Sequence, residues 1–228
     1  CKKNNISIIE DVAHAPGARL GGRDCGTWGD VGCFSFFANK NMTTGEGGMV
    51  TTNSDELAEK LRLLRSHGMT TMTLDRHLGR AYSYDVVELG YNYRLDEMRA
   101  ALGVVQLGQL AAFNARRRQL VVSYKALLAD VPGVSVPFSG SEEREAACHI
   151  MPVLLDPDVG RSFVMRQMRE AGIQTSIHYP AIHMFSYYSD FCPTHLPKTE
   201  DISSRQVTLP LYPTMTESQV EKVVGVLT

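Results

Sequence analysis

The chain of 228 residues is 43% hydrophobic and 21% charged, and its formal net charge is −2. This composition is sufficient for a buried core and excludes an intrinsically disordered chain. The small acidic excess argues against a general nucleic-acid binder, and no apolar run reaches the roughly 18 residues that a bilayer span requires. We therefore expect one large or two small folded domains, with neither nucleic acid nor a membrane as partner.

Cysteines are scattered along the chain, odd in number and without any C-x-x-C spacing: Cys1, Cys25, Cys33, Cys148 and Cys192. This pattern predicts neither a zinc site nor a disulfide framework, so no metal is expected. The beginning of the sequence also lacks the pattern of a signal peptide. Free thiols in a reducing cytosol, and hence a cytoplasmic location, are the expectation.

The first part of the chain alternates short apolar runs with turns. Residues 6–9 are apolar and end at Glu10 and Asp11, which predicts a buried strand with an acidic residue at its carboxyl end. Residues 12–30 are rich in glycine and predict a loop with at most a short helix. Further strands are predicted at residues 31–37 and 48–52, and a helix that begins near residue 55 and stops at Gly68.

A long helical pattern follows at residues 95–129, in which Gly103 and Gly108 suggest a kink or a break. Residues 69–94 between the two helices show no regular pattern. After this long helix the composition changes, and strands are predicted at residues 134–138, 149–155 and 174–180, with helices at 160–172 and 216–227. The chain is therefore predicted to be α/β, with one domain at residues 1–129 and a smaller one at 130–228.

Three polar residues follow strands in the first domain: Asp11, Ser35 and Lys40. Ligands of open α/β sheets bind outside the carboxyl ends of strands, where a lysine can form a Schiff base with an aldehyde cofactor. An aspartate can pair with a pyridinium nitrogen, and a serine can bind a phosphate. Taken singly, these residues also fit a solvated loop lysine, a turn aspartate and a packed strand serine. Together, in this order, they indicate pyridoxal 5′-phosphate (PLP).

Five segments carry a resemblance to a known family. They are IEDVAHAPGA (9–18), GDVGCFSFFANKNMTTGEGGMV (29–50), ELGYNYRLDEMRAALGVVQL (88–107), GIQTSIHYP (172–180) and VTLPLYPTMTESQVEKV (207–223). The sequence resembles the DegT/DnrJ/EryC1/StrS aminotransferases, over essentially the whole chain. The resemblance implies the fold-type I architecture of PLP-dependent aminotransferases, with part of the large domain followed by the smaller C-terminal α/β domain. It also implies a homodimer with shared active sites, which moves an amino group from glutamate or glutamine to a nucleotide-linked keto sugar.

The resemblance assigns a role to each matching residue. Lys40 would be the Schiff-base lysine and proton shuttle, Asp11 would bind the pyridine nitrogen, and Ser35 the phosphate. His14 would lie beside the cofactor ring, and Asn92 would reach the partner subunit's cofactor phosphate. Three further residues would bind substrate or organise its loop: Arg94, His178 and Tyr179. Local roles are the alternatives for three of these: a satisfied loop histidine for His14, a turn cap for Asn92 and buried strand packing for Tyr179.

Family members are usually well over 300 residues long, so we expect this chain to be a C-terminal portion. The remaining part would contribute the first strands, a phosphate-binding helix start and an aromatic residue stacked on the ring. Other functions remain open: a PLP-dependent sugar dehydratase, a relative acting on a cyclitol or another small ketone, or a non-catalytic scaffold or regulatory module. Lys40 favours transamination over dehydration, because some dehydratase relatives carry histidine there. Substrate specificity is expected in the loops at residues 69–88 and 183–200.

Overall fold

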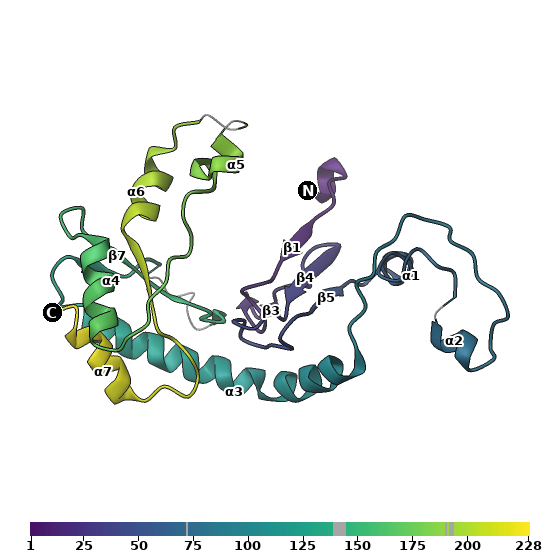
Figure 1. The fold of residues 1–228 in the computed structure, drawn as a ribbon, viewed down its shortest axis with the longest axis horizontal. Helices are drawn as coiled ribbons and strands as arrows, with labels where there is room; N and C mark the ends of the chain where they lie inside the picture. The colour runs from purple at the N-terminus through teal and green to yellow at the C-terminus, as the bar shows by residue number, and fades with distance from the viewer. Residues whose placement is uncertain (72, 139–144, 190, 192–193) are drawn as a thin grey trace. The chain divides into compact units, whose positions relative to one another are not determined.

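A computed structural model describes residues 1–71, 73–138, 145–189, 191 and 194–228, so Cys192 lies outside the described residues. The chain divides into two compact units, Cys1–Ala111 and Ala112–Thr228. This division falls inside the long helix and describes compact units rather than domains. The domain boundary predicted at residues 129/130 therefore stays a prediction. The elements in chain order (Figure 1) are η1 (Lys2–Asn4), β1 (Ile9–Asp11), β2 (Arg19–Leu20), β3 (Arg23–Asp24), β4 (Val31–Ser35), β5 (Gly48–Thr51), α1 (Asp55–Leu64), α2 (Thr73–His77), α3 (Glu97–Leu128), β6 (Val134–Ser135), β7 (Met151–Leu155), α4 (Arg161–Glu170), η3 (Ile182–Met184), α5 (Ser186–Ser189), α6 (Pro197–Arg205), β8 (Gln206–Leu209) and α7 (Glu217–Gly225).

The first unit is built on a three-stranded sheet in the order β1-β4-β5. Strand β1 runs parallel to β4, and β5 returns antiparallel to β4. The two strands predicted at residues 31–37 and 48–52 are confirmed, each slightly shorter than expected. Since β1 and β4 are parallel, their carboxyl ends meet at the same edge of the sheet.

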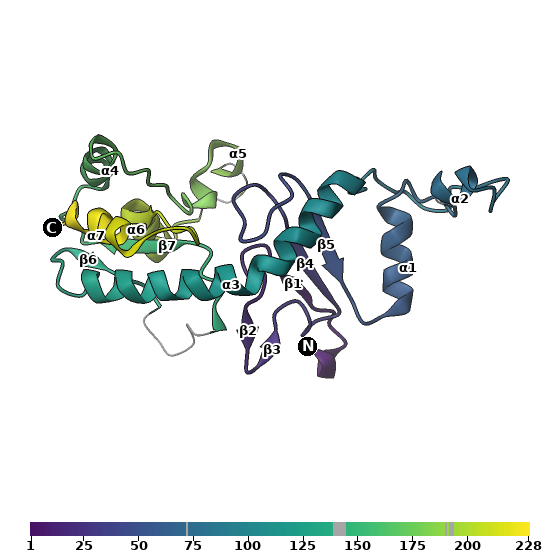
Figure 2. The same cartoon turned by 90° about the horizontal axis from the view of Figure 1, so that it is seen from below.

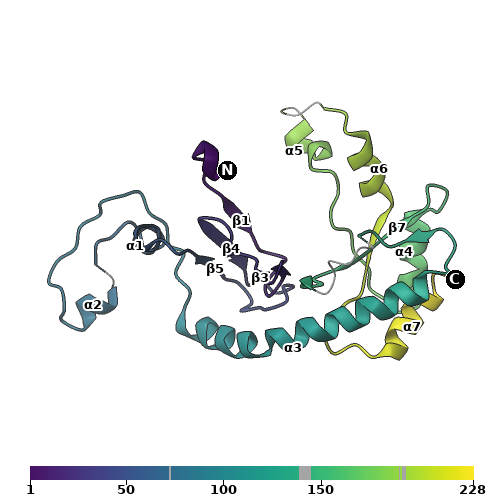
Figure 3. The ribbon, with the colours of Figure 1, turned by 180° about the vertical axis from the view of Figure 1, so that it is seen from behind.

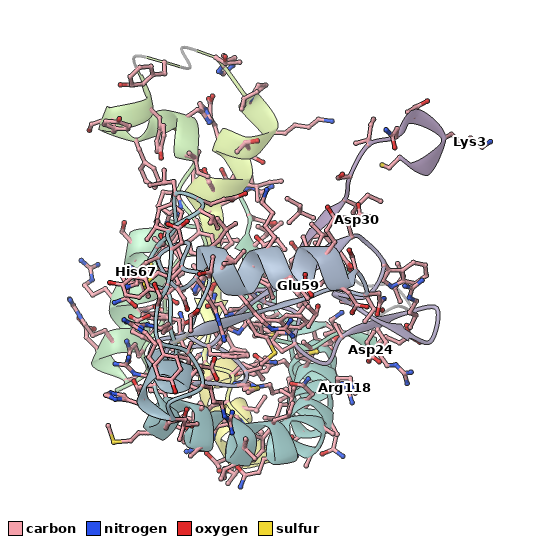
Figure 4. All side chains as sticks on the ribbon, turned by 90° about the vertical axis from the view of Figure 1, so that its right-hand side faces the viewer. Lys3, Asp24, Asp30, Glu59, His67 and Arg118 are labelled. Atoms are coloured by element: carbon pink, nitrogen blue, oxygen red, sulfur yellow. The ribbon has the colours of Figure 1, made fainter. Side chains whose placement is uncertain are left out.

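The prediction of a buried strand at residues 6–9 is wrong. The strand begins only at Ile9, whose side chain is 71% exposed, and Ile6 is 57% exposed. Polar contacts rather than apolar burial hold this end of the chain. The carboxylate of Asp30 accepts the N–H of Ile8 at 2.7 Å, immediately before β1. Asp30, labelled in Figure 4, directly precedes β4.

Residues 12–30 form more than the predicted loop, because β2 and β3 pair antiparallel within them (Figure 2). The carboxylate of Glu10 organises the turn that follows this ladder, and accepts three backbone N–H groups, from Gly26 at 2.8 Å, Trp28 at 2.6 Å and Gly29 at 2.8 Å. Burial disfavours the ionised carboxylate, but these three donors and the charge of Arg23 lower the pKa of Glu10 below its ordinary value. A charged side chain therefore shapes a glycine-rich segment that cannot pack by itself.

Helix α1 confirms the predicted helix start. The side chain of Ser54 caps the helix by accepting the N–H of Leu57 at 3.2 Å, as serine commonly does at this position. No residue of α1 is buried within its unit, and Figure 4 shows Glu59 on this helix. The predicted stop at Gly68 lies just beyond the observed end at Leu64.

Helix α3 is continuous from Glu97 to Leu128, so no break occurs at Gly103 or Gly108 (Figure 3). Gly103 instead permits a close approach. A Cβ atom on Gly103 would lie 3.2 Å from Cγ2 of Thr44, which is tighter than most such contacts. The glycine therefore lets the helix lie directly against the turn at residues 42–44.

The second unit contains an antiparallel sheet in the order β6-β7-β8 and a large hydrophobic core. The residues of β7 alternate between fully buried and half-buried positions, and all four residues of β8 are buried. The predicted strand at 149–155 and the helices at 160–172 and 216–227 are confirmed as β7, α4 and α7. Residues 174–180, predicted as a strand, contribute only the single bridge Ser176–Thr208. Within the described ranges, no helix combines the length and the apolar character that crossing a membrane demands.

Candidate active site

The register of the first sheet places two of the candidate residues together. Asp11 pairs with Cys33, and Ser35 lies two residues further along the same strand. Paired residues of neighbouring strands share a face, and residues two apart on one strand point the same way. Asp11 and Ser35 therefore lie on one face of the sheet, at its carboxyl edge, as predicted for the ligand end of an α/β sheet.

Lys40 lies in the turn that follows β4. The carbonyl oxygen of Phe36 organises this turn by accepting the N–H of Thr44 at 2.9 Å and the hydroxyl of Thr43 at 3.2 Å. Directly after Lys40 the chain is buried, with exposed fractions of 5% at Met42 and 3% at Thr44. Lys40 itself is half-buried, and its amine makes no hydrogen bond or ion pair within the described residues. This hydrogen-bonded turn thus presents an amine that the other described side chains leave available.

The buried residues after Lys40 are held by α3. Leu110 of this helix forms a small buried cluster with Phe36 and Met42. The side chain of Gln106 accepts the N–H of Thr43 at 3.5 Å, a long hydrogen bond. The position of the lysine turn therefore depends on residues more than sixty positions away in the sequence.

Asp11 has a local contact as well as a place at the sheet edge. Its Oδ1 atom accepts the N–H of Ala13 at 3.0 Å, which is the turn role that the sequence left open. Its Oδ2 atom accepts no hydrogen bond within the described residues. The chain then turns back on itself, because the N–H of Ala15 donates to the carbonyl oxygen of Val12. His14 lies in this turn and is half-buried.

Asn92 and Arg94 lie in the segment that returns past the end of α1. Asn92 bridges Ser66, and its Oδ1 atom accepts Nε–H of Arg94 at 3.1 Å. Two glycines allow this approach, since a Cβ atom on Gly90 would lie 2.0 Å from the backbone nitrogen of Gly68. Both polar side chains are exposed, and their mutual hydrogen bond gives the pair a defined geometry.

His178 and Tyr179 belong to the second unit. The rings of the two residues meet edge to face, with centroids 4.9 Å apart. Tyr179 is 56% exposed, so its alternative interpretation as a buried strand residue is wrong. Two residues of β8 hold His178. The backbone N–H of His178 donates to Oε1 of Gln206 at 3.0 Å, and its ring atom Nδ1 lies 2.9 Å from Oγ1 of Thr208.

Sequence reasoning missed the residues that position the candidates. Gln206 and Thr208 hold His178 from β8, a strand of only four residues whose alternation of polar and apolar side chains is too short to give a clear signal. Glu10 was recognised only as acidic, although it stands beside the glycine-rich loop that it organises. Among the residues that the structure describes, no group of three or more His, Cys, Asp or Glu side chains is arranged to hold a metal ion.

Comparison with known proteins gives these residues a context. The model of the DegT/DnrJ/EryC1/StrS aminotransferase family matches residues 1–228. The chain belongs to this family. An uncharacterized protein of Methanocaldococcus jannaschii, MJ1066, is 33% identical over 228 residues, which cover 97% of this chain and 59% of the relative. The chain thus spans about three-fifths of this curated relative's length.

Solved structures of aminotransferases have the same fold. PseC of Helicobacter pylori, an aminotransferase involved in the biosynthesis of pseudoaminic acid, matches with a TM-score of 0.89 and 28% identity, over 100% of this chain and 60% of PseC. The PLP form of Spr1654 from Streptococcus pneumoniae, assigned as a sugar aminotransferase, matches with a TM-score of 0.86 and 26% identity, over 97% of this chain and 57% of Spr1654. The fold is therefore that of PLP-dependent aminotransferases, and PLP is the cofactor of the family.

The side chains of the first unit fit this cofactor by their chemistry. PLP needs an amine for its aldehyde, an anion for its protonated ring nitrogen and donors for its phosphate. Lys40 offers an amine without a partner among the described residues, and Asp11 has a carboxylate oxygen that accepts no other hydrogen bond there. Ser35 supplies a hydroxyl on the same sheet face as Asp11. Neither Lys40 nor Asp11 forms an ion pair within the described part of the chain.

Proposed function

We propose that this chain forms part of a PLP-dependent aminotransferase that moves an amino group from glutamate or glutamine to a nucleotide-linked keto sugar. The observation that carries the proposal is the available amine of Lys40 in the turn after β4, at the edge where Asp11 and Ser35 share a face. We further propose a homodimer with shared active sites, in which Asn92 reaches the partner's cofactor phosphate. The scattered cysteines support a cytoplasmic location.

When bound, PLP supplies an aldehyde carbon that accepts an amine and a ring that withdraws electrons from the neighbouring carbon. Lys40 would hold the cofactor through its amine. The same amine would serve as general base and acid, which removes a proton from the substrate carbon and later returns one. Asp11 would keep the ring nitrogen protonated, because a carboxylate favours the charged form of a neighbouring base. Ser35 would donate its hydroxyl to the phosphate, and His14 would lie beside the ring.

Substrate recognition is assigned to Arg94, His178 and Tyr179. Arg94, oriented by Asn92, offers a guanidinium to a phosphate of the nucleotide. His178 and Tyr179 line the sugar-nucleotide pocket, where an aromatic ring and an imidazole provide stacking and hydrogen-bonding surfaces.

The decisive test is Lys40→Ala in the full-length protein loaded with PLP. We expect loss of amino transfer by a factor of about 10³ or more, since removing a catalytic base commonly costs about 10²–10⁴ and the covalent attachment is lost as well. The lysine-dependent visible absorbance of the bound cofactor should disappear in the same variant. Lys60→Ala is the matched control, because Lys60 lies on α1 and pairs with Glu88 on the surface. An absorbance band unchanged in Lys40→Ala would refute the assignment.

The alternatives are separated by the products. With ¹⁵N-labelled glutamate and a keto-sugar nucleotide, the proposed enzyme transfers the label to the sugar. A dehydratase would instead remove water from the sugar and leave the label in glutamate. A scaffold would show neither reaction and no lysine-dependent band. The presence of Lys40 favours amino transfer among these outcomes.

A further inference from the structure

Glu200, on α6, accepts hydrogen bonds from two separate parts of the preceding chain. Nε2 of His183 lies 3.0 Å from its carboxylate, and Nδ1 of His195 also lies 3.0 Å from it. The backbone N–H of Leu196 donates to the same carboxylate at 2.7 Å. An ionised carboxylate only accepts, so each histidine presents an N–H to Glu200. One side chain thus collects three donors from two segments.

His183 lies within a short segment that is otherwise turned outward. We call residues 182–189, which comprise η3 and α5, the aromatic segment. Its large side chains are exposed: Ile182 64%, Met184 64%, Phe185 42%, Tyr187 73% and Tyr188 45%. The side chain of His183 is only 11% exposed, in contact with Glu200. His183 is therefore the inward-facing anchor of this segment.

The electrostatics agree with an anchor. The hydrogen bond from His183, followed by the N–H of Leu196, lowers the pKa of Glu200 against the opposing effect of burial. Glu200 is thus ionised at neutral pH, where charge-assisted hydrogen bonds to a carboxylate are stronger than neutral ones. Its neighbour Asp201 pairs with Arg205 instead, with Nη2 and Oδ2 2.9 Å apart, and makes no hydrogen bond or ion pair with the aromatic segment among the described residues.

We propose that Glu200 is a positioning residue, which fixes the aromatic segment through His183 and thereby sets the affinity for the sugar-nucleotide substrate. This inference rests on the proposed function, because the aromatic segment directly follows His178 and Tyr179 in the chain. The exposed tyrosine and phenylalanine side chains provide flat surfaces for a nucleotide base or a sugar ring. A segment that is held in place loses less conformational entropy when the ligand binds.

The test uses Glu200→Gln in the full-length, PLP-loaded protein, with Asp201→Asn as the matched control on the same helix. Hydrogen exchange of the amides at residues 183–189 should become about tenfold faster in Glu200→Gln and stay unchanged in Asp201→Asn. The KM for the keto-sugar nucleotide should rise about five- to tenfold, while kcat and the KM for the amino donor change less than about twofold. If Glu200 contributed only to overall stability, the KM values for the two substrates would not change by different factors.

Each outcome decides one part of the inference. Exchange that is equal in Glu200→Gln and the parent protein would overturn the anchoring role. Faster exchange with an unchanged KM for the sugar nucleotide would overturn the role in substrate affinity. A protein that binds no nucleotide sugar at all would overturn the proposed function and the affinity role with it, and the exchange result would still decide the anchor.

Discussion

The two compact units are stabilised in different ways. The second unit buries a continuous hydrophobic cluster in which Val153, Leu155 and Val207 are fully inaccessible. The buried cluster of the first unit consists of Phe36, Met42 and Leu110. Side chains that commonly form cores are exposed there, such as Val50 at 44% on β5. Within each unit as described, the buried hydrophobic cluster of the second is much the larger.

This difference bears on function, because the proposed cofactor residues lie in the unit with fewer buried apolar side chains. Its loops are shaped by carboxylates and hydroxyls that accept backbone N–H groups, such as Glu10 and Asp30. Hydrogen bonds are directional, whereas apolar packing is not. At the turn of Lys40 both kinds of contact act, because hydrogen bonds to the carbonyl oxygen of Phe36 fix the turn and Leu110 packs against it.

The largest loss of stability is expected for Leu155→Ala, at a fully buried position of β7 in the second unit. Removing a buried leucine side chain costs about 2–5 kcal/mol, through lost transfer energy and the cavity left behind. Val50→Ala is the matched exposed change and should cost about 0.5 kcal/mol or less. Urea unfolding followed by circular dichroism measures both. Equal losses for the two variants would break the contrast between the units.

An intermediate effect is expected for Glu10→Gln, which removes the charge that holds the turn at residues 26–29. We expect a loss of about 1–2 kcal/mol, at the lower end of the roughly 1.5–3 kcal/mol for hydrogen bonds to charged groups, because Glu10 is only partly buried. Trp28 is the only tryptophan of the chain and donates its N–H to Glu10, so its fluorescence reports on this turn. The exposed Glu59 on α1 provides the control, Glu59→Gln.

The same residue predicts a pH dependence. Because the pKa of Glu10 is lowered in the folded state, its contribution to stability is present above about pH 4.5 and is lost as the pH falls through the lowered value. The Trp28 signal should therefore change with acid in the parent protein and much less in Glu10→Gln. An acid transition of equal size in both proteins would show that another group is responsible.

The smallest effects are expected at two helix caps. Ser54→Ala removes the cap of α1 and Thr216→Ala that of α7, each at a cost of about 1 kcal/mol. Helix α7 buries valines in its unit, whereas α1 buries no residue. Loss of the α7 cap should therefore affect the whole second unit, and loss of the α1 cap only α1 itself. Hydrogen exchange should show local fraying of α1, but faster exchange throughout the second unit for Thr216→Ala. Fraying confined to α7 would contradict this distinction.

Much of the local structure was predictable. Ser54 with Asp55 marked the start of α1, and the glycine-rich TTGEGG turn separated β4 from β5 as expected. The burial of residues 6–9 was predicted wrongly, because an apolar run does not reveal whether another layer covers it. Strand β8 was missed, and with it the partners of His178, because a strand of four residues with two polar side chains gives a weak signal.

The sequence by itself determined the order of the candidate groups, the turns between them and the family to which the chain belongs. These follow from capping residues, glycines and motifs that act over a few positions. Only the tertiary structure decided that Asp11 and Ser35 share a face, that α3 holds the turn after Lys40, and that Glu200 meets two histidines. The physical reason is that strand register and contacts between distant segments depend on packing of the whole unit, which no local pattern encodes.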